Sequence, residues 1–218
     1  MRIALKRGVS ADKLNDDTSN VDVIFCGFNG ETIDFRKELK GDSEKLLAIG
    51  RLSRDKKSVV IGGYVTENYG LTRLSAVVAD KGKILGISDM SVSVHNTVYS
   101  LGSGFKVYNI TGCKIGVLIG DDMLFPESVR SLTDCDVDVI FIINGSCKHG
   151  IFLSVLRSQA YLYGVPLISI GSKIAAVDGD GNVIIDSQSQ SEIIDVDTKK
   201  RFSEVYLKRR GFKKSEEK

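Results

Sequence analysis

The chain has 218 residues, of which 42% are hydrophobic and 27% charged, and its formal net charge is +2. This composition is typical of a soluble globular protein and excludes a disordered, collagen-like or disulfide-stapled chain. The length predicts one domain with a sizeable core, and no apolar run approaches the ~20 residues of a membrane span.

Charge is distributed unevenly along the chain. Residues 199–218 contain nine Lys or Arg and three Glu, a net charge of +6, so residues 1–198 carry −4. The sequence therefore predicts a folded domain over 1–198 and a basic C-terminal arm over 199–218. The acidic body argues against a nucleic-acid-binding core. The arm is interpreted as a solvated terminus or interface arm, with contact to nucleic acid or acidic lipid as the alternative.

The cysteines and histidines predict neither a metal site nor a cofactor. The four cysteines form no CxxC pair, and the two histidines lie far apart in the sequence. Zinc sites need a closely spaced set of such ligands. Reduced thiols and the lack of an apolar signal segment in the first ten residues together predict a cytoplasmic location.

Short Val- and Ile-rich segments alternate with a few helical ones. The predicted strands are residues 2–5, 21–26, 58–66, 74–79, 83–88, 105–110, 114–119, 137–143, 166–170, 174–177, 183–185 and 193–196. The predicted helices are residues 43–55 with Ser43 as N-cap, a helix opening at 125–127, and residues 151–163 and 199–210. Residues 80–82 and 179–182 predict hairpin turns.

This order predicts an α/β (α+β) fold. Two packed sheets with helices on their outer faces would bury all the apolar strands, and a single doubly wound sheet remains the alternative.

The segment KIGVLIGDDMLFPESVR, residues 114–130, resembles the nitrilase (carbon–nitrogen hydrolase) superfamily around its nucleophile. The matching residues are Asp122, Phe125, Pro126, Glu127 and Arg130. The strands at the N-terminus, at 82–86 and after residue 134, and the segment 156–172, resemble further family elements. The resemblance thus extends over about residues 1–200.

The resemblance implies a four-layer α-β-β-α sandwich, here with a shortened first helix, and a homodimer formed through helices. It also implies a Glu-Lys-Cys triad that hydrolyses amides or nitriles. In such a triad the thiolate attacks, the carboxylate transfers protons and the ammonium stabilises the oxyanion.

None of the three triad positions carries its reactive side chain here. The nucleophile position falls on Gly120 and the lysine position on Met90. The glutamate position falls on Cys26–Gly27 or Gly27–Phe28, depending on a one-residue slip. Other family positions also differ, with Leu74 in place of an Asn and Gln159 in place of an Arg.

Six other residues could line a pocket: Cys26, Glu31, Asp121, Asp122, Cys147 and His149. Beside Lys148 and His149, Cys147 could have a lowered thiol pKa, although an ordinary loop thiol explains it too. An exposed loop carboxylate explains Glu31 as well as a relocated base does. Asp121 and Asp122 are interpreted as structural hydrogen-bond acceptors, with metal binding as the alternative.

We therefore predict a catalytically inactive nitrilase-like protein kept for binding or assembly, with a small amide-like ligand or a protein as its partner. The alternative is an amidohydrolase whose nucleophile has moved to Cys147 or Cys26. A third hypothesis is a nucleic-acid or lipid-surface binder that acts through the basic arm. A fold does not by itself determine a function, so the site must decide among these.

Overall fold

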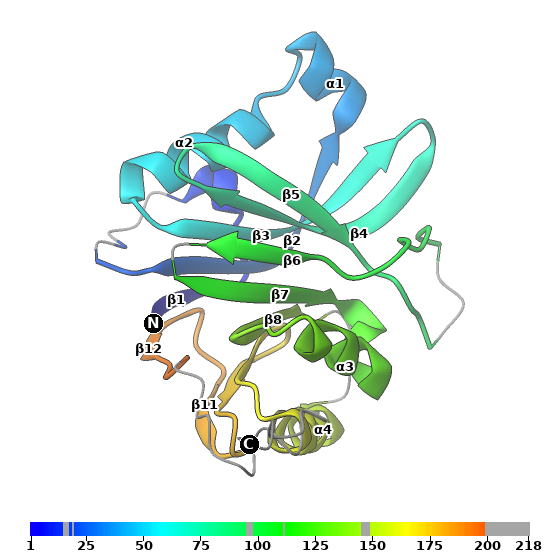
Figure 1. Cartoon of the computed structure of the whole chain (residues 1–218). Coiled ribbons are helices and arrows are strands. Elements are labelled where there is room, and N and C mark those ends of the chain that lie inside the picture. The colour runs from blue at the N-terminus through cyan, green and yellow to red at the C-terminus, as the bar shows by residue number, and fades with distance from the viewer. Residues whose placement is uncertain (15–17, 19, 95–97, 111, 145–148, 199–218) are drawn as a thin grey trace, which may run out of the picture.

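Two six-stranded mixed sheets stack face to face in the computed structural model, which describes residues 1–14, 18, 20–94, 98–110, 112–144 and 149–198 (Figure 1). The first sheet has the order β12-β1-β2-β3-β4-β5 and the second the order β11-β10-β9-β8-β7-β6. Parallel pairing joins β1, β2 and β3 in one sheet and β7, β8 and β9 in the other. The remaining neighbours pair antiparallel.

The strands of the first sheet are β1 (Arg2–Lys6), β2 (Val23–Asp34), β3 (Val59–Asn68), β4 (Leu71–Asp80), β5 (Lys83–Asp89) and β12 (Ser191–Asp195). Those of the second are β6 (Val107–Ile110), β7 (Cys113–Ile119), β8 (Val139–Ile143), β9 (Leu167–Ile170), β10 (Ile174–Val177) and β11 (Val183–Ser187). The helices are η1 (Ala11–Lys13), α1 (Phe35–Lys40), α2 (Lys45–Lys56), η2 (Gly120–Leu124), α3 (Pro126–Asp134) and α4 (His149–Tyr163).

Three apolar layers hold these elements together. The central layer lies between the sheets, where the rings of Phe25 and Phe141 meet edge to face with their centroids 5.1 Å apart. A second layer joins the outer face of the first sheet to α2 and η1 through Ile49 and Ala11. A third joins the other sheet to α3 and α4. Burial on both faces explains the nearly continuous apolar sequence of β7 and β8. The predicted α-β-β-α sandwich is confirmed.

The shortened first helix is also present, because a single 3-10 turn, η1, is the helical element described between β1 and β2. The predicted hairpin at 80–82 is confirmed as well: Lys81 and Gly82 have φ of 50° and 83°, as a two-residue hairpin loop requires.

Several boundaries differ from the sequence-based prediction. β2 was predicted to end at Cys26 but continues to Asp34, since β3 runs beside it as far as the pair Asp34–Glu67. The segment was missed because Gly27, Asn29 and Gly30 interrupt the apolar pattern. The short helix α1 that follows was not predicted.

Ser43 was predicted to cap α2, and this was wrong. The N-cap residue is Glu44, whose side chain makes no capping hydrogen bond. The Ser43 hydroxyl donates instead to the carboxylate of Glu38. The predicted helix at 199–210 lies outside the described residues.

In the part of the chain that the structure describes, no helix is both long enough and apolar enough to cross a membrane.

Candidate functional site

The structure brings Met90 and Gly120, the predicted lysine and nucleophile positions, into direct contact. Met90 follows β5 of one sheet, and Gly120 begins η2 directly after β7 of the other. A Cβ atom built on Gly120 would lie 2.6 Å from the Met90 sulfur, closer than two such atoms can approach. The Met90 thioether therefore occupies the space into which a side chain at position 120 would project.

The predicted glutamate position on β2, at Gly27 and Phe28, also has apolar neighbours. A Cβ atom built on Gly27 would lie 2.6 Å from Cγ2 of Ile170, on β9 of the facing sheet. Phe28 is partly buried against the same central core that contains Met90. Its Cδ1 lies 2.9 Å from a Cβ built on Gly63 of the neighbouring strand β3. Among the described residues, the side chains in contact with this part of β2 are thus apolar.

Asp122 ties the end of β7 to the segment after Met90. Its carboxylate accepts hydrogen bonds from the backbone N–H groups of Ser91 (2.8 Å), Val92 (2.9 Å) and Ile119 (3.0 Å). The side chain is 1% exposed, and burial raises the pKa of the carboxyl to about 6 although the three hydrogen bonds lower it. Asp122 thus fixes Met90 against Gly120.

Asp121 binds the next two residues of the same segment, Ser93 and Val94. Its Oδ2 accepts from the Val94 N–H at 3.0 Å and from the Ser93 hydroxyl at 3.1 Å. Among the described residues, no group of three His, Cys, Asp or Glu side chains is arranged to hold a metal ion.

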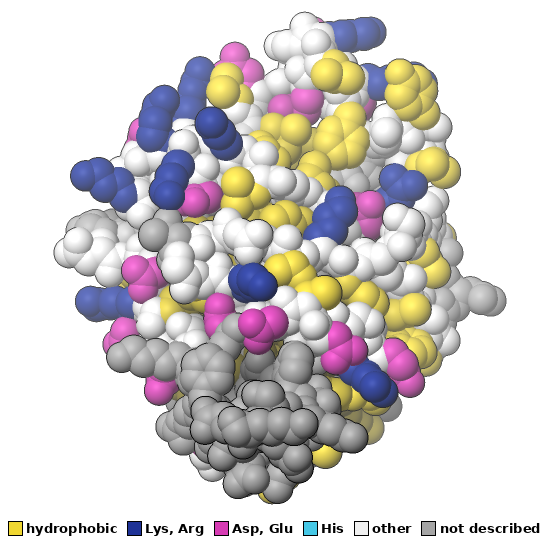
Figure 2. All heavy atoms as spheres, viewed as in Figure 1, with side chains coloured by type: hydrophobic (Ala, Val, Ile, Leu, Met, Phe, Trp, Pro, Cys, Tyr) yellow, Lys and Arg dark blue, Asp and Glu magenta, His cyan; other side chains and the backbone are white. Residues whose placement is uncertain are grey.

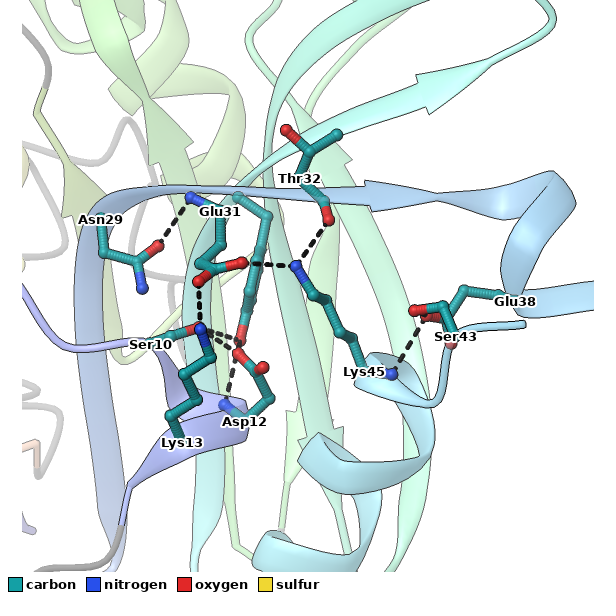
Figure 3. A network of polar contacts seen from close by, with 10 residues as sticks. Ser10, Asp12, Lys13, Asn29, Glu31, Thr32, Glu38, Ser43 and Lys45 are labelled. Atoms are coloured by element: carbon teal, nitrogen blue, oxygen red, sulfur yellow. Dashed lines mark hydrogen bonds and ion pairs between the residues drawn. The ribbon is translucent and has the colours of Figure 1, made fainter. Parts of the chain in front are cut away.

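Glu31 lies on the helical side of the first sheet, where two lysines hold its carboxylate (Figure 3). Lys13 of η1 donates to one oxygen, and Lys45 of α2 donates to the other at 2.5 Å. Hydrogen bonds from these two ammonium groups lower the pKa of Glu31 to about 2. A carboxylate held in this way is a weak proton acceptor at neutral pH.

Cys26 also faces the helical layer. It belongs to the apolar cluster with Ile49 and Ala11, whereas Met90 belongs to the cluster between the sheets. The thiol is fully buried, and burial raises its pKa to about 12. It therefore stays protonated at neutral pH and is a poor nucleophile. Cys147 and its neighbour Lys148 lie outside the described residues. His149 begins α4, and its side chain is not described.

The predicted site residues thus fall into separate places. The core between the sheets is in contact with Gly27, Phe28, Met90 and Gly120. Asp121 and Asp122 directly follow Gly120 in the chain. Cys26 and Glu31 lie on the opposite face of β2. Sequence reasoning missed Lys13 and Lys45 as partners of Glu31, because they come from η1 and from α2, which begins 14 residues beyond it.

The comparisons with known proteins agree with this architecture. The family model described as carbon-nitrogen hydrolase matches residues 23–200. The chain belongs to the carbon-nitrogen hydrolase family.

Solved structures of this family are similar throughout the sandwich. A cysteine-to-alanine mutant of the Nesterenkonia AN1 amidase from the nitrilase superfamily has a TM-score of 0.72 at 15% identity, with 88% of each chain covered. The NitN amidase from the same source, after removal of its tag, has a TM-score of 0.72 at 14% identity, with 95% of each chain covered.

A third structure is a glutamate-to-leucine mutant of that amidase. In it the acetamide moiety of fluoroacetamide is covalently added at the active-site cysteine. It has a TM-score of 0.69 at 14% identity and covers 88% of each chain. Among curated proteins, none matches this sequence. At these identities the structural likeness shows the fold alone.

Proposed function

We propose that this carbon-nitrogen hydrolase fold has lost C–N bond hydrolysis and serves in binding or assembly. The observation that carries the proposal is the contact between Gly120 and Met90. The Met90 sulfur lies 2.6 Å from where a Cβ at position 120 would be.

The chemistry of the reaction supports this reading. Amide hydrolysis on this fold needs a nucleophile, a proton-transfer group and a stabiliser of the oxyanion. The Nesterenkonia amidase carries an active-site cysteine. Here glycine, methionine and the segment Cys26–Phe28 occupy the three triad positions. None of these residues supplies a carboxylate or an ammonium group, and the one thiol, Cys26, is buried on the far face of the sheet.

The test is the release of ammonia from a panel of small amides and nitriles, with the Nesterenkonia amidase assayed in parallel. We expect no release by the purified chain under conditions in which the amidase is active. Heat-labile release proportional to protein concentration would contradict the proposal.

The second candidate is a C–N hydrolase with Cys147 as a relocated nucleophile, motivated by the neighbouring Lys148 and His149 in the sequence. If release occurs, Cys147→Ala should abolish it, whereas Cys135→Ala, at an exposed cysteine after α3, should leave it unchanged. Cys26 is a weaker candidate for a relocated nucleophile, because burial raises the pKa of its thiol.

For assembly, we propose a homodimer formed through the outer face of α4. Ile151, Tyr161 and Leu162 of this helix are 64%, 49% and 55% exposed. Arg157, the one Lys, Arg, Asp or Glu in the helix, donates from Nε to the Gly181 carbonyl at 2.9 Å. An exposed helical face that combines large apolar side chains with little charge favours a protein partner.

The cytoplasmic location also stays a prediction. It rests on the reduced thiols expected from the sequence.

A further inference from the structure

A groove of about 600 Å³ opens at the amino ends of the parallel strands. It lies near Asp22, which precedes β2, near Val59, which begins β3, and near Cys113, which begins β7. Gly120 follows the other end of β7, so the groove and the family's catalytic position are at opposite ends of the sandwich.

The floor of the groove is apolar. Val59 belongs to the core cluster between the sheets, and Met1, Ile110 and Cys113 pack against that cluster while remaining partly exposed. An apolar group in the groove would therefore continue the central core. The volume falls within the range of small-molecule sites, roughly 300–1,000 Å³.

The rim carries three basic and two acidic side chains. Arg54 and Lys57 come from the end of α2, and Lys81 from the β4–β5 turn, and all three are exposed. Asp22 accepts the Arg2 N–H at 2.7 Å, and Asp80 Oδ2 lies 4.0 Å from Lys81 Nζ. Arg54 donates from Nε to Asp55 Oδ1 at 3.1 Å, which leaves its terminal guanidinium nitrogens for a further contact.

Lys57 makes no ion pair with any residue that the structure describes. Figure 2 shows Lys and Arg side chains gathered over α2, so the groove borders a positively charged part of the surface.

We propose that this groove binds a small amphipathic monoanion. The anionic group would contact Lys57 and Arg54, and the apolar body would lie on Val59, Ile110 and Cys113. The charge of the rim disfavours the chain's own arm, residues 199–218, as the occupant, because that arm carries +6. The proposal does not depend on whether the chain hydrolyses C–N bonds, since the groove contains none of the triad positions.

Cys113 provides the measurement, because it is a lining residue of the groove and carries a thiol. Alkylation of the full chain by the neutral reagent iodoacetamide would be followed at each cysteine by mass spectrometry, with octanoate as the probe. We expect octanoate at saturation to slow alkylation of Cys113 at least fivefold. The exposed Cys135 is the internal control and should be unaffected. Octylammonium, of the same length and opposite charge, should not protect Cys113.

Variants at the rim complete the test. Lys57→Gln should weaken octanoate protection at least threefold, and Lys40→Gln, at an exposed position on α1, should leave it unchanged. Equal protection by octanoate and octylammonium, no protection at all, or full protection in Lys57→Gln would each overturn the proposal. So would a Cys113 that resists alkylation without any probe while Cys135 reacts, because the groove would then already be covered by the arm or by a second copy of the chain.

Discussion

Met90 fills the space beside Gly120. Its thioether lies where a side chain on Gly120 would project, and Gly120 has a φ of 60°, a backbone conformation that glycine adopts without strain. A side chain introduced at position 120 would therefore have a strained backbone and would require the Met90 thioether to move.

Asp122 makes a pH-dependent contribution to stability at the same place. Its folded-state pKa is raised from 3.8 to about 6, so the folded chain binds a proton that the unfolded chain has already released between pH 4 and 6. The free energy of unfolding should therefore fall as pH rises through this window, by about 3 kcal/mol at most.

Urea titrations from pH 4 to 7 measure this contribution. We expect the difference in unfolding free energy between the native chain and Asp122→Asn to change across that window. A pH-independent difference for Asp122→Asn would contradict the assignment of the buried proton.

The N-terminus of helix α2 is capped by a side chain of the preceding helix, α1. The Glu38 carboxylate of α1 accepts from the backbone N–H groups of Lys45 (3.0 Å) and Leu46 (3.1 Å). These are among the N–H groups that have no partner within the helix itself. A carboxylate here also interacts favourably with the positive end of the helix dipole.

Glu38→Ala should therefore destabilise the protein by about 1 kcal/mol, the typical contribution of a helix cap. Ser43→Ala, at the position that the sequence pattern favoured as the cap, should cost less, because its hydroxyl contacts Glu38 rather than the helix backbone. Urea unfolding of the two variants compares them directly. An equal or larger effect of Ser43→Ala would show that the Glu38 side chain does not stabilise the N-terminus of α2.

The whole molecule is a sandwich whose two outer helical layers differ. α2 presents many charged side chains, whereas α4 presents Ile151, Tyr161 and Leu162. We expect light scattering after size-exclusion chromatography to give the mass of two 23.8 kDa chains. Leu162→Glu should shift the mass to one chain, because a dimer would bury that charge.

Leu39→Glu is the matched control for this prediction. Leu39 is an exposed leucine on α1, away from α4, and its replacement should leave the dimer intact. A dimer that survives Leu162→Glu would show that the α4 face is not the interface.

The sequence alone predicted most of the strands, the hairpin turns and the family membership; the replaced triad positions stay a prediction. Each of these depends on local patterns: apolar runs, turn residues, or a short motif around Asp122 and Phe125. Tertiary structure decided the rest, because it depends on residues far apart in the chain. It placed Met90 over Gly120 and paired Glu31 with Lys13 and Lys45. It also turned Cys26 away from the centre of the sandwich, a choice of strand face on which one residue of register reverses every side chain.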